Sequence, residues 1–202
     1  MSLLLIRHGE TDLNAARILQ YPDTPLSTHG CLQAERVGRR LGEHPVQLIV
    51  TSDYTRARMT ADQIARYTGA RLIETPLLRE RNFGELRGES YESLGDIDVF
   101  ALDYAPPGGE SWPVFHARVD RAWDELLKHT ATVTGDIAVI THGLVLRSLI
   151  ERRLDTSAHL VTPEFVVANT AVTTVDIAAP WRVADLACIA HLDGLAVGGA
   201  PA

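Results

Sequence analysis

The chain has 202 residues, of which 46% are hydrophobic, 22% charged and 6% aromatic. This length suits one domain, and the composition is ordinary for a globular protein, which excludes fibrous and largely disordered chains. Lysine and arginine total 19 against 26 aspartates and glutamates, and the resulting net charge of -7 argues against a nucleic-acid partner, because such binders usually carry a basic excess or stripe.

Apolar runs and helical periodicity alternate along the first third of the chain. Residues 2–6 (SLLLI) form a short apolar run that is typical of a buried strand. Ser27 can cap a helix whose apolar residues recur on one face, and Gly69 can end a second helix. In chain order we expect strands at 2–6, 47–51 and 71–74, with helices at 27–41 and 56–67.

The pattern breaks at residues 76–110, where glycine and proline recur and loops are expected, with one short helix near 91–94. Ser111 and Pro113 then begin a long amphipathic helix that reaches about His129. The remaining expected elements are a strand at 137–141, a helix at 143–154, and strands at 170–177 and 182–189 joined by a turn at 179–181.

Strands that alternate with helices predict an α/β fold, a three-layer α/β/α sandwich with a mostly parallel sheet and helices on both faces. We expect a single domain over residues 1–194, into which the loop-rich residues 76–110 are inserted as a cap. The glycine- and alanine-rich tail at 195–202 is expected to be flexible.

The sequence also predicts where the protein acts. No apolar run approaches the roughly 20 residues of a membrane helix, and the first residues reach charge too soon for a signal peptide. Cys31 and Cys188 are the only cysteines, so no disulfide framework is expected. We therefore expect a cytoplasmic protein with no membrane partner, no metal and no cofactor.

Two of the expected strands run directly into a His-Gly pair. LLLIRHG places His8 after the first strand, and AVITHGL places His142 after the strand at 137–141. Ligands bind beyond the carboxyl ends of parallel strands, and Gly9 and Gly143 allow the backbone to approach a ligand closely. One such histidine alone is more often a turn residue, whereas two together favour a ligand site.

Two charged residues can join these histidines. Arg56 stands at or near a helix N-terminus, where unpaired N–H groups and the helix dipole favour an anion. Glu80 stands in the loop-rich segment beside Leu77 and Leu78, where a raised pKa would suit a general acid. Taken singly, each is more simply a solvated surface residue.

Five short motifs occur in order along the chain: RHGET at 7–11, SDYTRARMTA at 52–61, LRERNFGE at 78–85, PGGES at 107–111 and THG at 141–143. A lone RHG is a weak signal, but the ordered set is specific. Together the motifs resemble the histidine phosphatase superfamily, the phosphoglycerate-mutase-like proteins, across nearly the whole chain. The resemblance implies a phosphoglycerate-mutase-like version of the α/β/α fold.

The resemblance also implies a role for each matching residue. His8 matches the histidine that attacks phosphorus and becomes phosphorylated, and Glu80 matches the proton donor to the leaving oxygen. The other implied site residues are Arg7, Arg56 and His142 for catalysis and phosphate binding, Asn14 and Gly143 beside the phosphate, and Thr11, Gln20, Tyr21 and Arg81 at the substrate rim.

A reaction without a metal follows from this set. A phosphate monoester is largely a dianion near neutral pH, and fixed cationic donors can stabilise the transferring group, here two arginines and a protonated His142. A phosphohistidine intermediate divides one difficult step into two easier ones. We expect a metal-independent phosphomonoester hydrolase that acts on a small phosphorylated metabolite.

The sequence departs from the family pattern at three places. Met59 stands where the second motif often has glutamine, and Arg17 lies one place early for the usual Arg-x-Gln-Gly. Leu144 replaces the second glycine that commonly follows THG. All three lie near the expected pocket rim, so they bear on the substrate rather than on the reaction.

Other activities stay open. A phosphoglycerate mutase uses the same core, but it carries a longer insertion with paired arginines, and no Arg-Arg pair occurs between Glu80 and His142. An alpha-ribazole phosphatase has a similarly short form. A non-catalytic phosphate-binding relative is disfavoured by the intact His8, Glu80 and His142, and a metal site is disfavoured because no element shows ligand spacing. The sequence also leaves a homo-oligomer open.

Overall fold

The computed structural model describes residues 1–195, which form a six-stranded sheet with the order β3-β2-β4-β1-β5-β6. Parallel pairing joins β1 (Ser2–Arg7), β2 (Val46–Ser52), β3 (Arg71–Thr75) and β4 (Asp136–Thr141). β5 (Val172–Asp176) runs antiparallel to β1, and β6 (Val183–Cys188) runs antiparallel to β5. The sheet is therefore mostly parallel, as the sequence predicts.

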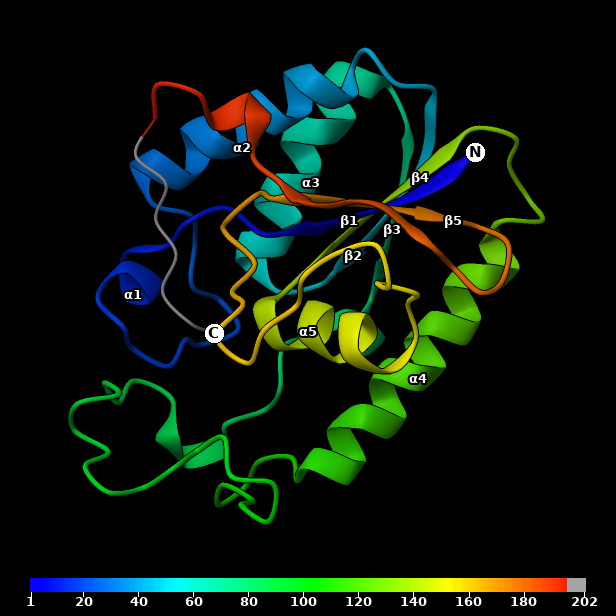
Figure 1. Cartoon of the computed structure of the whole chain (residues 1–202). Helices are drawn as coiled ribbons and strands as arrows, with labels where there is room; N and C mark the ends of the chain where they lie inside the picture. Colours follow the sequence, from blue (N-terminus) through cyan, green and yellow to red (C-terminus); the bar gives the residue numbers. More distant parts are fainter. Residues whose placement is uncertain (196–202) are drawn as a thin grey trace.

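Helices cover both faces of the sheet (Figure 1). α2 (Thr28–Leu41) and α3 (Thr55–Thr68) pack on one face, and α4 (Trp112–His129) and α5 (Gly143–Arg152) pack on the other. The short α1 (Asp12–Ala15) follows β1, and 3-10 turns lie at Pro76–Leu78, Gly84–Leu86 and Ala190–Leu192. The predicted three-layer arrangement is confirmed. No helix within residues 1–195 is long and apolar enough to cross a membrane.

The side chains of β1 explain why both faces are covered. Leu3 and Leu5 belong to the core beneath α4 and α5, whereas Leu4 and Ile6 belong to the core beneath α2 and α3, and all four are buried. Successive side chains of a strand point to opposite faces, so a continuous apolar run needs cover on both sides.

The helix ends follow the local chemistry that the sequence predicts. The Ser27 hydroxyl accepts a hydrogen bond from the Gly30 N–H at 2.9 Å, which caps α2. Gly69 ends α3 with a φ of 68°, in the left-handed region that glycine enters without strain. Ser111 precedes α4, with a proline in the first turn.

The short helix expected near 91–94 is wrong, because the backbone forms turns there. Ser90 bridges to Ile18, and the Ser93 hydroxyl donates to the Ser90 carbonyl at 2.7 Å, a local bond that competes with helix formation. Gly95 then takes a φ of 56°. Of the tail expected to be flexible, residues 196–202 lie outside the described residues.

The register of the central strands decides where the polar residues lie. Arg7 of β1 pairs with Thr141 of β4, and the His8 N–H donates to the Thr141 carbonyl at 2.9 Å. β2 is the next strand beyond β4 and ends at Ser52. The residues that follow these three strands therefore meet at one edge of the sheet, below which the loop-rich residues 76–110 extend (Figure 1).

Candidate active site

Two histidine rings stand together where β1 and β4 end. The ring centroids of His8 and His142 are 5.1 Å apart with an interplanar angle of 59°, and both residues are buried. The sequence motif that delivers each ring is a buried strand followed by His-Gly. The two rings meet because their strands are parallel neighbours.

The hydrogen bonds of His8 fix which nitrogen is free to react. Nδ1 lies 2.7 Å from the carbonyl oxygen of Gly9, so Nδ1 carries the hydrogen and donates it. Nε2 then keeps its lone pair, which accepts a hydrogen bond from Nε of Arg56 at 3.2 Å. Burial, followed by the charges of Arg56 and Arg7, holds the pKa of His8 well below its usual value of 6.5. His8 is therefore neutral at pH 7, with Nε2 facing a cation.

Two buried arginines supply that positive charge. Arg7 and Arg56 are each 2% exposed. Arg56 donates to the Tyr21 carbonyl at 3.0 Å, and Arg7 donates to the Val167 carbonyl at 2.6 Å, so both guanidinium groups are held in place. Burial lowers the pKa of Arg56 to about 10, which still leaves it charged at neutral pH. Such fixed forks suit the oxygens of a phosphate.

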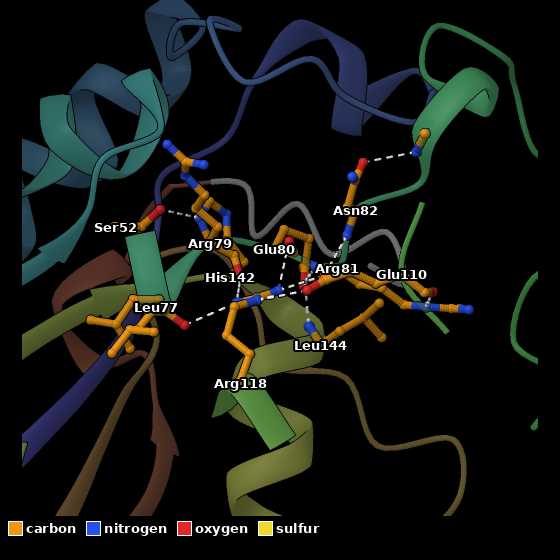
Figure 2. Close-up of polar contacts among 12 residues, drawn as sticks. Ser52, Leu77, Arg79, Glu80, Arg81, Asn82, Glu110, Arg118, His142 and Leu144 are labelled. Carbon is orange, nitrogen blue, oxygen red and sulfur yellow. Dashed lines mark hydrogen bonds and ion pairs between the residues drawn. The ribbon is translucent and has the colours of Figure 1, made fainter. Parts of the chain in front are cut away.

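His142 is held by Ser52 (Figure 2). Its Nε2 lies 2.8 Å from the Ser52 hydroxyl oxygen, which also accepts the Tyr54 N–H at 3.3 Å. When the Ser52 hydroxyl donates its hydrogen to Nε2, the ring hydrogen of neutral His142 lies on Nδ1. Among residues 1–195, no hydrogen-bond partner lies at Nδ1.

The protonation of His142 expected beside a bound phosphate stays a prediction. Burial, followed by the charge of Arg56, holds the pKa of His142 well below 6.5, so the ring is neutral when the pocket holds no anion. A neutral ring with its hydrogen on Nδ1 can still donate to a phosphate oxygen, so the pocket does not need a third positive charge.

Glu80 is the carboxylic acid of this pocket. Its oxygens accept the Arg81 N–H at 2.9 Å and the Leu144 N–H at 3.1 Å (Figure 2). Burial raises the pKa of Glu80 despite these two bonds and the nearby charges of Arg56 and Arg7. A carboxyl group with a raised pKa keeps more of its proton near neutral pH, which is what a general acid needs.

An ion pair that the sequence analysis missed holds the Glu80 segment. Arg118 of α4 donates to the carbonyls of Leu77, Arg79 and Glu80 at 2.9, 2.7 and 3.2 Å. The Glu110 carboxylate binds the same guanidinium at 2.8 and 2.7 Å (Figure 2). Glu110 lies in the PGGES motif, so that motif does more than start a helix. We call the pair Glu110–Arg118 the clamp.

The remaining predicted phosphate-side residues lie in two places. Asn14 lines the same pocket as His8 and Glu80, and its amide donates to Asn169 at 3.4 Å. Gln20, which is predicted at the substrate rim, also lines this pocket. Gly143 instead lines a neighbouring pocket, together with Leu144.

Three of the predicted rim residues have other contacts. Thr11 is fully buried and caps α1, where its hydroxyl accepts the Asn14 N–H at 3.0 Å. Tyr21 is 47% exposed, and its hydroxyl lies against Gly88. Arg81 lines the pocket, but its guanidinium donates to the carbonyls of Val99, Tyr104 and Glu110 inside the loop-rich segment, so it binds that segment rather than a ligand.

Several residues of the pocket went unnoticed in the sequence. The amide of Asn169 donates to the His8 carbonyl at 2.9 Å, and the next N–H, that of Thr170, donates to the Arg7 carbonyl at 3.0 Å. Their only sequence signal is a polar pair just before a strand. Arg87 and Tyr91 also line the pocket, and Ser52 supports His142 as described above. Arg17, which the sequence analysis places near the rim, lines the pocket as well.

The fold and the site together define an α/β protein with a two-histidine, two-arginine pocket at the carboxyl edge of a mostly parallel sheet. A family model described as "Histidine phosphatase superfamily (branch 1)" matches residues 3–185. The chain belongs to this superfamily, in agreement with the resemblance of its five motifs.

Known relatives carry the names of both mutases and phosphatases. The "Probable phosphoglycerate mutase GpmB" of Photorhabdus laumondii is 31% identical over 96% of this chain and 95% of its own. The solved mycobacterial glucosyl-3-phosphoglycerate phosphatase, in complex with VO3, has a TM-score of 0.72 at 27% identity and covers 87% of this chain and 90% of its own. The solved alpha-ribazole phosphatase of Shigella flexneri has a TM-score of 0.75 at 26% identity, and the match covers 90% of this chain and 93% of the phosphatase chain.

Proposed function

We propose that the protein hydrolyses phosphomonoesters of small metabolites through a phosphohistidine on His8, without a metal. One observation carries this proposal: a neutral His8 presents its Nε2 lone pair beside two buried arginines, in the same pocket as Glu80, a carboxyl group with a raised pKa. The named phosphatases among its structural relatives support the same reading.

In the first step Nε2 of His8 attacks phosphorus in line with the leaving oxygen. The N–P bond forms as the ester P–O bond breaks, and the proton of Glu80 passes to the leaving oxygen, which departs as an alcohol. Arg7, Arg56 and the Nδ1–H of His142 donate to the other phosphate oxygens, which carry the charge of the transition state.

In the second step water attacks the phosphohistidine. Glu80, now a carboxylate, accepts a proton from the water as the O–P bond forms and the N–P bond breaks. Inorganic phosphate leaves, His8 is again neutral, and Glu80 is again protonated. The protein thus returns to its starting state after both steps.

The mutase is the second candidate, and the name of the GpmB relative favours it. A phosphoglycerate mutase must hold a substrate carboxylate while the phosphate is returned. Two arginines of the loop-rich segment line the pocket, and both have protein partners: Arg81 binds three backbone carbonyls, and Arg87 donates to the Tyr54 hydroxyl at 3.3 Å. This arrangement supports hydrolysis over phosphate return.

The test is turnover of p-nitrophenyl phosphate and of 3-phosphoglycerate by the protein and its His8→Ala variant, all in EDTA. We expect phosphate release and acid-labile, base-stable phosphate labelling in the unsubstituted protein and neither in the variant. Labelling that persists in His8→Ala, or activity that needs added Mg²⁺, contradicts the mechanism. Isomerisation of 3-phosphoglycerate far above phosphate release would make the protein a mutase.

A further inference from the structure

A second pocket adjoins the proposed catalytic site. Its volume is about 410 Å³, within the range that small-molecule sites occupy. It lies among α5, the start of α4, the loop-rich segment and residues 163–167. The apolar side chains of its wall are Phe100, Leu102, Trp112, Leu144, Phe165, Val166 and Val167.

Two residues join this pocket to the catalytic one. Arg7 lines both pockets. Leu144 lines the apolar pocket and, through its N–H, holds the Glu80 carboxyl at 3.1 Å. A leaving oxygen that receives the proton of Glu80 must lie beside that carboxyl. The carbon atoms attached to the oxygen therefore begin within reach of Leu144.

The polar groups of the wall are engaged with one another. Nε of Arg147 donates to Glu151 at 2.8 Å, and Nδ1 of His116 lies 2.8 Å from the Ser148 hydroxyl. Arg7 donates to the Val167 carbonyl, which belongs to the same wall. Glu151 balances the charge of Arg147 at the solvent-exposed part of the wall, and apolar side chains make up most of the rest, so the pocket suits a mainly apolar group.

Large apolar side chains also stand exposed at this pocket. Phe100 is 37%, Leu102 83% and Val166 38% exposed. Contiguous exposed apolar surface marks ligand or partner sites more often than chance. The direct continuity with the catalytic pocket argues for a part of the substrate as the occupant.

We propose that this pocket binds the leaving group of the substrate, and that this group is an apolar alcohol with an aromatic ring or a branched aliphatic chain. The inference rests on the proposed phosphatase function and names the substrate class of that site. It separates the protein from relatives whose names specify phosphoglycerate or glucosyl-phosphoglycerate, because those compounds are polar and carry a carboxylate.

Binding of phosphonates tests the pocket without turnover. Methylphosphonate can fill only the phosphate site, whereas 3-phenylpropylphosphonate carries an apolar group of the proposed class. Burial of several additional carbon atoms in an apolar pocket tightens the binding of a ligand by about tenfold or more. We therefore expect 3-phenylpropylphosphonate to bind at least about tenfold more tightly by calorimetry, and equal affinities would overturn the proposal.

Two leucines provide a matched pair of variants. Leu102 lines the pocket and is 83% exposed, while Leu160 is 85% exposed and is absent from the pocket wall. Both substitutions to glutamate should leave folding intact, since neither side chain is buried. We expect Leu102→Glu to lower the affinity for 3-phenylpropylphosphonate by about tenfold or more and to leave the affinity for methylphosphonate unchanged. Leu160→Glu should change neither affinity.

Turnover separates this proposal from the function on which it rests. With 3-phenylpropyl phosphate and glycerol phosphate as substrates, we expect the apolar ester to have the higher kcat/KM, and Leu102→Glu to remove the difference. Equal kcat/KM values for the two esters would overturn the leaving-group role of the pocket and leave the proposed phosphatase function standing. Selective binding of 3-phenylpropylphosphonate without turnover of any ester would support an apolar ligand in this pocket and overturn the phosphatase function. A change of oligomeric mass in Leu102→Glu, with both affinities retained, would make this surface a contact between copies and also overturn the proposal.

Discussion

Glu80 combines a raised pKa with two backbone hydrogen bonds that hold its carboxyl group in one orientation. When Glu80 protonates the leaving oxygen, the rate enhancement that it provides depends on how basic that oxygen is. We expect Glu80→Gln to slow alkyl phosphates by about 10²–10⁴-fold and p-nitrophenyl phosphate much less, because p-nitrophenolate leaves unprotonated. Single-turnover rates of His8 phosphorylation measure this difference.

The pH dependence of the same step supplies a control for Glu80. The acid form is lost as pH rises through the raised pKa, so the alkyl phosphate rate falls on the alkaline side, and Glu80→Gln should lack that fall. Equal losses of phosphorylation rate for both leaving groups would move the acid to another carboxyl group.

Ser52 decides which nitrogen of His142 carries the hydrogen. Ser52→Ala removes the donor to Nε2, so Nδ1 no longer reliably donates to phosphate unless the ring is protonated. We expect kcat/KM to fall by about tenfold, because a ring with its hydrogen on Nε2 has none to donate from Nδ1, and the lowered pKa of His142 keeps the ring from gaining a second one near neutral pH. Ser52→Thr, which keeps the hydroxyl, should restore the rate. Equal kcat/KM values in Ser52→Ala and Ser52→Thr would contradict this role.

At the scale of elements, the clamp ties the Glu80 segment to α4. Arg118→Leu frees the carbonyls of residues 77, 79 and 80 and leaves Glu110 without its cation. We expect the variant to resemble Glu80→Gln, with alkyl phosphates slowed more than p-nitrophenyl phosphate, because the acid is displaced while His8 is untouched. Arg121→Leu, an exposed arginine of the same helix, is the matched control and should change neither rate.

A purely structural clamp would give a different result for Arg118→Leu. Loss of one partner from a partly buried ion pair also destabilises the fold, by about 2–3 kcal/mol. If that were its whole effect, both substrates would lose activity equally at temperatures where the variant stays folded. Unfolding curves recorded beside the two rates separate the outcomes.

The same elements show what the sequence could and could not predict. His8 and His142 were predictable because each follows a continuous apolar strand, and parallel strands end at one edge. Ser52 and Asn169 were not, because their roles depend on the register between strands far apart in sequence. The register sets Val172 opposite Ile6, which brings residues 169 and 170 beside His8.

The loop-rich segment was the least predictable element. A short segment without periodicity must satisfy its open carbonyls with side chains, and Arg81 and Arg118 do so. In the sequence these arginines are indistinguishable from substrate-binding ones, so Arg81 was assigned to the rim and Arg118 was passed over. The expected helix near 91–94 failed for a related reason, since Ser93 bonds its own backbone.

At the scale of the whole molecule, two buried neutral histidines make the fold sensitive to acid. Both folded-state pKa values lie below the usual 6.5, so the unfolded chain binds more protons as pH falls below that value. Stability is therefore present above about pH 6.5 and is lost as pH falls toward the folded-state pKa values, by about 1.4 kcal/mol per pH unit for each histidine. Urea unfolding between pH 7.5 and pH 5 measures the slope.

His8→Asn removes one titrating ring and should reduce this slope by at most about 1.4 kcal/mol per pH unit. Burial also lowers the pKa of His142, of His116 and of His191, the last to about 4, so these rings keep their share of the slope. Above pH 7 the free energy of unfolding of the variant should run parallel to that of the unsubstituted protein, because neither protein then takes up protons at this site. An unchanged slope in His8→Asn would mean that the acid sensitivity arises elsewhere in the fold.

The N–H of Leu144 has a consequence for how such a protein can diverge. The residue acts on the acid through its main chain and on the apolar pocket through its side chain. Replacement of the side chain can alter what the pocket accepts while the inherited N–H still holds Glu80, and only proline would remove both at once. Single point mutations at this position can thus change which substrates the pocket accepts without disturbing proton donation by Glu80.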